Sequence, residues 1–389
     1  MSGDLLCISH LRWGFVYQRP NHLMARWARE RRVYFVEEPV YDEPEPRMEV
    51  RTVAEDLHVA VPHLPVGLTA AEDEALRKVL TDQLVVNTRL RDPLLWMYSP
   101  MGWPQVKHVK ASAVVYDCMD ELAHFRGAPP KLAERERAVF ARADLVFTGG
   151  QSLYEAKRTQ HPHVHAFPSS VDARHFERAR RRGLDPRDQK DIPHPRVGFF
   201  GVVDERMNLE LVAEVANLRP NLHFIFVGPV VKIEPGVLPQ APNIHWLGGK
   251  TYEELPDYVA GWDVAMMPFA LNDSTRFISP TKTLEYLAAH RPIVSTSIRD
   301  VVEPYGEQNL VRIADTPFAF AAAIDAALDE RGTQREEAWK QAAEECLANT
   351  SWDRTWSRMC AHVDEVLMRR ARGATGRESR EETMPCSTI

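Results

Sequence analysis

Short apolar segments alternate with helical stretches twice along this chain, and a polar segment rich in chain breakers separates the two series. Short strands that are apolar at nearly every position are typical of parallel sheets buried on both faces. We therefore predict the α/β class, with two Rossmann-like, doubly wound domains that face a cleft. The expected strands are 5–9, 33–37, 57–61, 94–98, 113–117, 145–148 and 164–167 in the first series, and 196–200, 223–227, 244–247, 264–268 and 293–296 in the second.

The breaker-rich segment at 177–195 is expected to link the two domains. It separates a first domain at 1–176 from a second domain at 196–350. A helix at 351–372 is expected to cross back to the first domain, and the charged tail at 373–389 is predicted to be disordered. Open α/β sheets bind ligands at the carboxyl ends of their strands, so the cleft between the domains is the expected site.

The charge and the cysteines of the chain exclude several classes of protein. The formal net charge over 389 residues is -7, so we expect no nucleic-acid partner. The five cysteines are scattered without a C-x-x-C pair, which argues against a zinc site or a disulfide framework and fits a reducing cytosol. No signal peptide or membrane span is recognisable, so we expect a cytoplasmic protein.

An anion-binding pattern lies between the fourth expected strand of the second series and the helix that follows it. Ser279 suits the N-cap of that helix and Pro280 its first position. Thr281 and Lys282 then fall in the first turn, where free backbone N–H groups and the helix dipole attract anions. Glu285 follows one turn later. This grouping suits a nucleoside diphosphate whose ribose is held by the carboxylate.

A second phosphate-binding candidate follows the first strand of the second series. Gly201 lets the chain turn tightly off that strand, and Arg206 comes shortly after it. Arg206 could grip a phosphate with two parallel hydrogen bonds, or it could only pair with Asp204 and Glu205 on the surface. Lys282, expected at the end of a neighbouring strand, favours phosphate. The dinucleotide fingerprint and the P-loop pattern are both missing from the sequence.

These residues resemble the donor half of a retaining GT-B glycosyltransferase of family 4, the group that includes teichuronic-acid and other cell-surface polysaccharide transferases. The resemblance covers residues 5–370 and rests on Gly201, Arg206, Ser279, Pro280, Lys282, Glu285, the strand from Pro292 to Val294 and the segment from Phe167 to Asp172. It implies a hexosyltransferase that uses a nucleoside-diphosphate sugar and needs no cofactor and no metal. Arg206 and Lys282 would stabilise the leaving phosphate, which would itself assist attack on the same face of the sugar.

One family residue is missing. The family pattern has two glutamates separated by seven residues; if Glu285 is the second, the first falls at Phe277. That first glutamate sits near the donor sugar in the family. Asn272, Asp273 or Thr275 could supply a polar contact from the same loop, and spacing does not choose among them.

The loop after the first strand is expected to face the acceptor. Gln18, Arg19 and His22 lie there and could bind sugar hydroxyls. The alternative is a helix cap in which Arg19 is solvated and His22 is packed.

Another acceptor-side group follows the strand at 113–117. Asp117 and Asp120 could accept protons from acceptor hydroxyls or could cap the next helix, and His124 could be an acid, a base or a structural residue. The histidine-rich run at 161–165 lacks an evident third metal ligand, so we predict no metal site.

Three functions remain to be distinguished. The main hypothesis is a glycosyltransferase that acts on a glycan, a lipid-linked acceptor or a small molecule. The alternatives are a nucleotide-sugar epimerase of the same fold and a non-catalytic nucleotide-sugar binding protein, the latter suggested by Phe277. Basic side chains on helices of the first domain are expected to be solvated, with a peripheral membrane contact as the alternative.

Overall fold

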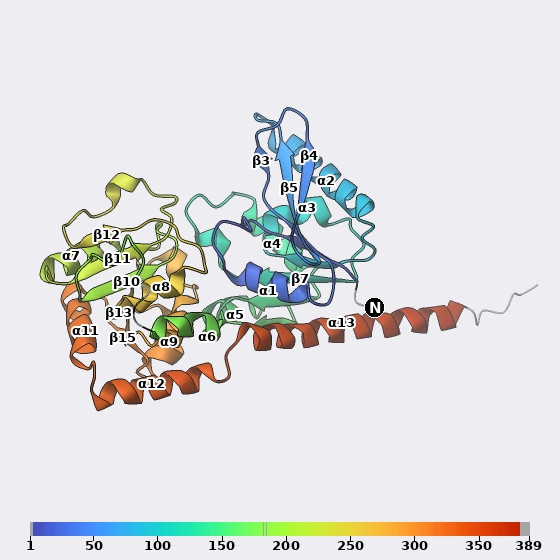
Figure 1. Cartoon of the computed structure of the whole chain (residues 1–389). Coiled ribbons are helices and arrows are strands. Elements are labelled where there is room, and N and C mark those ends of the chain that lie inside the picture. Colours follow the sequence, from blue (N-terminus) through green and yellow to red (C-terminus); the bar gives the residue numbers. More distant parts are fainter. Residues whose placement is uncertain (1–2, 182, 184, 382–389) are drawn as a thin grey trace, which may run out of the picture.

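The computed structural model describes residues 3–181, 183 and 185–381, with 373–381 described as backbone only, and contains two sheets that lie side by side (Figure 1). The first sheet has the order β3-β5-β2-β1-β6-β7-β8-β9, with β4 paired to β5. Every pairing in it is parallel except β4 with β5. Its strands are β1 (Leu5–Ile8), β2 (Val33–Val36), β3 (Val40–Tyr41), β4 (Arg47–Ala54), β5 (Leu57–Leu64), β6 (Leu94–Met97), β7 (Ala113–Cys118), β8 (Leu145–Thr148) and β9 (Val164–Ala166).

The second sheet is parallel throughout and has the order β12-β11-β10-β13-β14-β15. Its strands are β10 (Arg196–Phe200), β11 (His223–Val227), β12 (Ile244–Trp246), β13 (Val264–Met267), β14 (Ile293–Ser295) and β15 (Val311–Ile313). The two-domain α/β prediction is therefore confirmed, and each expected strand has its counterpart. Sequence patterns missed β3, β4 and β15.

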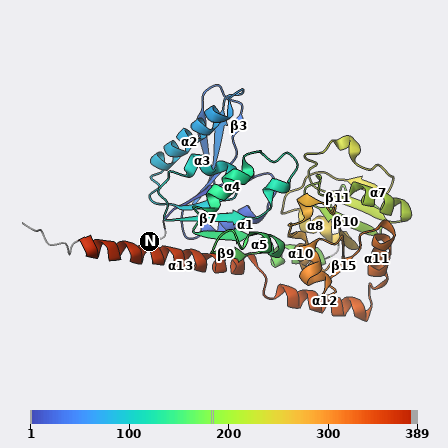
Figure 2. The same ribbon diagram turned by 180° about the vertical axis from the view of Figure 1, so that it is seen from behind.

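Helices cover both faces of the first sheet. On one face α1 and the C-terminal helix pack on Leu5 and Cys7, and on the other α2, α3, α4 and α5 pack on Leu6 and Ile8 (Figure 2). Alternate residues of β1 thus enter opposite cores, as a doubly wound sheet requires. The helices of this domain are α1 (Arg19–Trp27), α2 (Ala70–Asn87), α3 (Trp103–Val106), α4 (Leu132–Phe140) and α5 (Gln151–Lys157), whereas α6 (Ala173–Glu177), which follows them in the chain, packs against the second domain.

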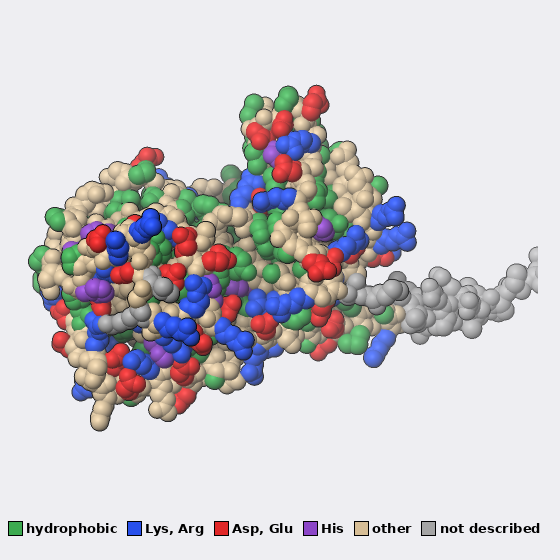
Figure 3. Space-filling view, in the orientation of Figure 1, with side chains coloured by type: hydrophobic (Ala, Val, Ile, Leu, Met, Phe, Trp, Pro, Cys, Tyr) green, Lys and Arg blue, Asp and Glu red, His purple; other side chains and the backbone are tan. Residues whose placement is uncertain are grey.

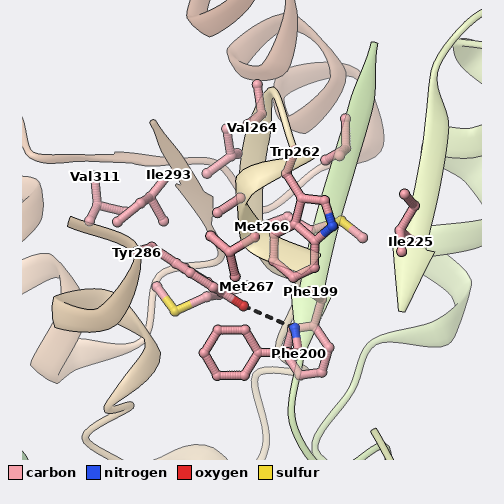
Figure 4. Close-up of a cluster of buried hydrophobic side chains, with 14 of the residues drawn as sticks. Phe199, Phe200, Ile225, Trp262, Val264, Met266, Met267, Tyr286, Ile293 and Val311 are labelled. Atoms are coloured by element: carbon pink, nitrogen blue, oxygen red, sulfur yellow. Dashed lines mark hydrogen bonds between the residues drawn. The ribbon is translucent and has the colours of Figure 1, made fainter. Parts of the chain in front are cut away.

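The second domain has one continuous apolar core that fixes the end of β10 (Figure 4). The hydroxyl of the fully buried Tyr286 accepts a hydrogen bond of 3.0 Å from the backbone N–H of Phe200. A Cβ atom at Gly198 would lie 1.9 Å from the Trp262 ring, so this strand position needs glycine. The helices of this half are α7 (Leu209–Leu218), α8 (Leu255–Ala260), α9 (Lys282–Ala288), α10 (Arg299–Val301), α11 (Pro317–Asp329) and α12 (Gln334–Leu347).

The hairpin of β4 and β5 stands out above the first domain (Figure 3). Nearly every residue of β4 is exposed, so the strand carries no apolar pattern that a sequence could reveal. Charged side chains such as Arg47 and Glu49 lie on this hairpin and pair with each other at 3.2 Å. Charges on an exposed edge strand disfavour pairing with another chain.

The last helix, α13 (Trp352–Glu381), returns from the second domain and runs beneath the first (Figure 1). Trp352, Met359 and Val363 on this helix are buried in the core of the first domain. The prediction of a disordered tail from residue 373 is wrong as far as Glu381, because α13 continues to that residue. Once a helix is anchored by packing, each further residue can join it by adding one hydrogen bond. Residues 382–389 of that predicted tail lie outside the described residues. Within the described ranges we find no helix with the length and apolarity needed to cross a bilayer.

Candidate active site in the interdomain cleft

A pocket of about 180 Å³ lies between the two domains, where the carboxyl ends of both sets of strands meet. Both domains contribute to its lining, the first through the β1–α1 and β7–α4 loops and the second through the β10–α7 and β13–α9 loops. The predicted residues that line it are Gln18, Arg19, Asp120, Gly201, Arg206, Ser279, Pro280, Thr281, Lys282 and Glu285. The structure thus brings the two phosphate-binding candidates and part of the acceptor-side set into one cavity.

Gly201 forms the floor on which Lys282 lies. Its φ is +130°, a conformation that other residues rarely adopt. A Cβ atom at Gly201 would lie 2.3 Å from Cε of Lys282 and 2.7 Å from its Nζ. The glycine therefore serves both the turn and the close approach of the lysine.

The start of α9 differs from the prediction. The helix begins at Lys282, and the backbone carbonyl of Thr281 accepts hydrogen bonds from Leu284 and Glu285. Ser279 is therefore not the N-cap, and Pro280 precedes the helix. Ser279 instead lies against the first domain, because a Cβ atom at Gly150 would be 2.9 Å from that of Ser279. Ser279 and Pro280 nevertheless line the pocket, as predicted.

Arg206 pairs with a neighbouring carboxylate and also faces the cleft, so both roles considered for it are compatible with the structure. Its guanidinium donates two hydrogen bonds to the buried carboxylate of Asp204, with Nε 2.9 Å from Oδ1 and Nη2 2.7 Å from Oδ2. The same side chain lines the pocket and lies 5.5 Å from the Phe125 ring of the first domain. Asp204 thus orients a cation that faces the cleft.

Lys282 and Glu285 carry opposite charge into the pocket. Burial lowers the pKa of Lys282 and raises the pKa of Glu285, although each partner favours the charged form of the other. Among the described residues, neither side chain has a hydrogen bond or an ion pair within 4 Å, which leaves both groups available to a ligand. The Lys282 ammonium lies 5.4 Å from the Phe199 ring, which positions it without neutralising it.

Asp120 is the acidic residue of the first domain that lines the pocket. Burial raises the pKa of Asp120 to about 6, while the nearby guanidinium groups of Arg206 and Arg19 act in the opposite direction. His124 lies outside the pocket, exposed, with its ring 5.6 Å from that of Phe277. The predicted acid or base role of His124 therefore has no support in this arrangement.

Two predicted acceptor contacts are buried structural groups instead. Asp117 is fully buried and pairs at 2.8 Å with Arg19, whose guanidinium also donates to the carbonyl of Phe167. His22 is stacked on Trp352 with ring centroids 4.6 Å apart. Arg19 is therefore not solvated, and the packed alternative holds for His22. Burial is also the main cause that lowers the pKa of His22.

The loop before α9 is held by its own side chains. The side chains of Asn272 and Thr275 cap a short 3-10 turn at Asp273–Thr275, and the Thr275 hydroxyl donates to the backbone of Ala270. Neither residue lines the pocket in this arrangement, so a contact of either with the donor sugar stays a prediction. Phe277 packs against the core of the first domain.

Aromatic side chains that sequence patterns did not select complete the wall. Tyr252 stacks on Tyr17 at 4.5 Å and on His175 at 4.1 Å, and it lines the pocket with Lys250. Lys250 and Tyr252 follow the strand at 244–247, which was the sequence signal for them, whereas Tyr17 lies in the loop after β1. Tyr17 and Tyr252 come from different domains, so their stack closes one side of the cleft.

A larger hollow of about 710 Å³ lies on the first domain alone. Four of its charged side chains form two pairs: Arg77 lies 2.5 Å from Asp73, and Arg135 contacts Glu74. The interdomain pocket is smaller, but it holds the cation and the carboxylate that lack partners. Chemistry therefore favours the cleft.

Comparison with known proteins agrees with this choice. Residues 194–330 match the family model described as glycosyl transferases group 1, a range that includes Gly201, Arg206, Lys282 and Glu285. A Bacillus subtilis protein, TuaH, is 25% identical over 281 residues, which is 67% of this chain and 68% of the relative. Its name assigns it provisionally as a teichuronic acid biosynthesis glycosyltransferase. The protein is a glycosyltransferase.

Solved structures show that the fold of this glycosyltransferase is GT-B. Sucrose-phosphate synthase from Thermosynechococcus elongatus superposes with a TM-score of 0.68 at 14% identity, covering 94% of this chain and 99% of that chain. Anabaena HepE, solved with UDP and glucose, gives a TM-score of 0.64 at 14% identity, covering 93% and 99%. These likenesses establish the fold of the enzyme.

Proposed function

We propose that this glycosyltransferase moves a sugar from a nucleoside-diphosphate sugar to a hydroxyl acceptor, with retention of the anomeric configuration. The observation that carries the proposal is the unpartnered Lys282 beside Arg206 and Glu285 in the cleft. Arg206 and Lys282 would bind the diphosphate, and Glu285 would accept hydrogen bonds from the ribose. The Anabaena neighbour, crystallised with UDP and glucose, supports a donor of this class.

The chemistry follows from the charges. As the bond between the anomeric carbon and the phosphate oxygen breaks, negative charge grows on the diphosphate, where Arg206 and Lys282 stabilise it. The acceptor oxygen forms its bond to the same face of that carbon and passes its proton to the departing phosphate oxygen. No protein nucleophile is needed, and the two cations supply the charge that a metal would otherwise provide.

The acceptor belongs to glycan or glycolipid synthesis in this proposal. The name of the Bacillus relative supports cell-surface polysaccharide synthesis, and the acceptor could be a glycan, a lipid-linked sugar or a small molecule. We place the reaction in the cytoplasm, with a peripheral membrane contact if the acceptor is lipid-linked. The described cysteines, all free thiols, are compatible with a reducing compartment.

The direct test is loss of donor turnover in Lys282→Ala and Arg206→Ala. Release of nucleotide from a panel of nucleoside-diphosphate sugars should fall by about 100-fold or more in each variant, because removing one transition-state donor costs that much. Circular dichroism and the melting temperature should show that the fold survives. Lys78→Ala, on the exposed side of α2, is the matched control and should keep full activity.

Two results would contradict the proposal. Full turnover in both variants would show that these cations do not hold the leaving group. Binding of a donor by the wild-type protein without any release of nucleotide, with or without acceptor, would favour the non-catalytic binding protein.

A further inference from the structure

Glu205, next to Arg206 in the β10–α7 loop, is buried without a hydrogen-bond partner. Its side chain is 14% exposed, and both carboxylate oxygens are shielded from solvent with no donor among the described residues. The nearest cation is the ammonium of Lys232, 3.9 Å from Oε1. A carboxylate in such a place is unfavourable until a donor reaches it.

His10 presents a second unpartnered acceptor from the other domain. It follows β1, and its Nδ1 is buried with no partner in the described part of the chain. Nδ1 is the ring atom left without a hydrogen bond, although the ring also interacts with the backbone of Tyr98. Burial, helped by the charge of Lys232, lowers the pKa of His10 to about 4, so the ring is neutral near pH 7.

Phe125 joins the two sides of this region. Its ring, in the loop after β7, lies 5.5 Å from the guanidinium of Arg206 and 5.1 Å from the ammonium of Lys232. Lys232 is also the shared neighbour of Glu205 and His10. Both orphan acceptors are therefore neighbours of Lys232, and Glu205 directly precedes Arg206, the cation that is proposed to bind phosphate.

The chemistry of the pair selects its ligand. Both groups accept hydrogen bonds and have none to accept, so the ligand must bring donors. An anion would meet the Glu205 carboxylate, and a metal ion would meet the Lys232 ammonium, which leaves a neutral group with several O–H bonds. A sugar attached to the phosphate held by Arg206 is the nearest such group.

We propose that Glu205 and His10 bind hydroxyl groups of the donor sugar, one from each domain, and so select the sugar. This inference rests on the proposed function, because Arg206 must hold the diphosphate for the sugar to reach Glu205. Glu205 would then supply a carboxylate to the donor sugar. The position where such a carboxylate was expected holds Phe277.

The test separates the sugar from the nucleotide. Dissociation constants would be measured by calorimetry for UDP-, ADP-, GDP- and dTDP-glucose and for each diphosphate alone, in the wild-type protein, Glu205→Gln and His10→Ala. For the nucleotide sugar that binds the wild-type protein, each variant should weaken binding at least tenfold, and binding of the matching diphosphate should change less than twofold. Glu214→Gln, on the exposed face of α7, is the control and should alter neither constant.

Each other outcome has a distinct meaning. Equal weakening of the sugar form and the diphosphate would show a merely structural role for Glu205 and His10 and would overturn the inference. Unchanged binding of both ligands would overturn it as well, while leaving the proposed function intact. A wild-type protein that binds no nucleotide sugar or diphosphate would overturn the proposed function, and this inference with it.

Discussion

On the first-domain wall of the cleft, burial raises the pKa of Asp120 to about 6. The unfolded chain loses this proton near pH 4, so between about pH 4 and 6 the folded protein holds more protons than the unfolded one. Rising pH through this window therefore lowers the free energy of unfolding.

Asp120→Asn should remove this pH dependence, because an amide does not titrate. The variant should match the wild-type protein in melting temperature near pH 4 and exceed it above pH 6.5, by about 1–3 kcal/mol in stability. Melting curves of both proteins at half-unit pH steps check this. A difference that stays constant with pH would show that Asp120 is ionised and well solvated in the folded protein.

At the scale of elements, the turn after β10 and the start of α9 form one unit. Gly201→Ala should push the Lys282 side chain from its place, since the added Cβ would lie 2.3 Å from Cε, and it should strain a backbone with φ +130°. We expect a loss of about 1–3 kcal/mol in stability. Diphosphate binding should weaken at the same time, as measured by calorimetry.

The control for that substitution is Gly236→Ala, where no atom lies within 4 Å of the added Cβ. It should leave diphosphate binding unchanged. Normal binding in Gly201→Ala would mean that the position of Lys282 does not depend on the turn.

The elements also show what the sequence could and could not predict. Strands such as β10 and β13 are buried on both faces, so their apolar sequences could be recognised as strands. The strand β4 is exposed and has no such apolar pattern. Gly201 was predictable because the turn after β10 needs a positive φ, and Lys282 was predictable because a cation at a helix start that follows a strand suits an anion site. The role of Ser279 was not, because its contact is with Gly150 of the other domain and no local pattern records it.

At the scale of the whole molecule, a carboxylate of one domain caps a helix of the other. Asp300 accepts hydrogen bonds of 2.8 and 3.0 Å from the backbone N–H groups of Gln151 and Ser152, at the start of α5. Arg299 adds an ion pair of 2.6 Å with Glu155. The cleft in this arrangement measures about 180 Å³. Ligand pockets usually measure about 300–1,000 Å³, so a donor should enter with the domains further apart.

Asp300→Ala should loosen this arrangement, because it leaves the backbone N–H groups of Gln151 and Ser152 without the carboxylate of the second domain that caps them. Hydrogen exchange at Gln151 and Ser152 should become faster, and the radius of gyration from small-angle scattering should increase. Asp329→Ala, at an exposed position of α11, should change neither quantity. Unchanged exchange at α5 in Asp300→Ala would show that the cap does not hold the domains together.

Contacts between residues that are far apart in the sequence explain several errors of prediction in the site. His22 and Asp117 had the residue types of sugar ligands, but Trp352 and Arg19, distant in the sequence, bury them. The stack of Tyr17 on Tyr252 also joins two domains and left no local signal. The phosphate side of the site was predictable because it lies within single loops, and the sugar and acceptor side was not.

The most direct measurement is a crystal structure of the protein with a bound nucleoside diphosphate. We predict phosphate oxygens within hydrogen-bonding distance of Arg206 and Lys282 and ribose hydroxyls on the Glu285 carboxylate. A nucleotide bound in the hollow of the first domain, or in the cleft without contact to either cation, would contradict the assignment of the donor site.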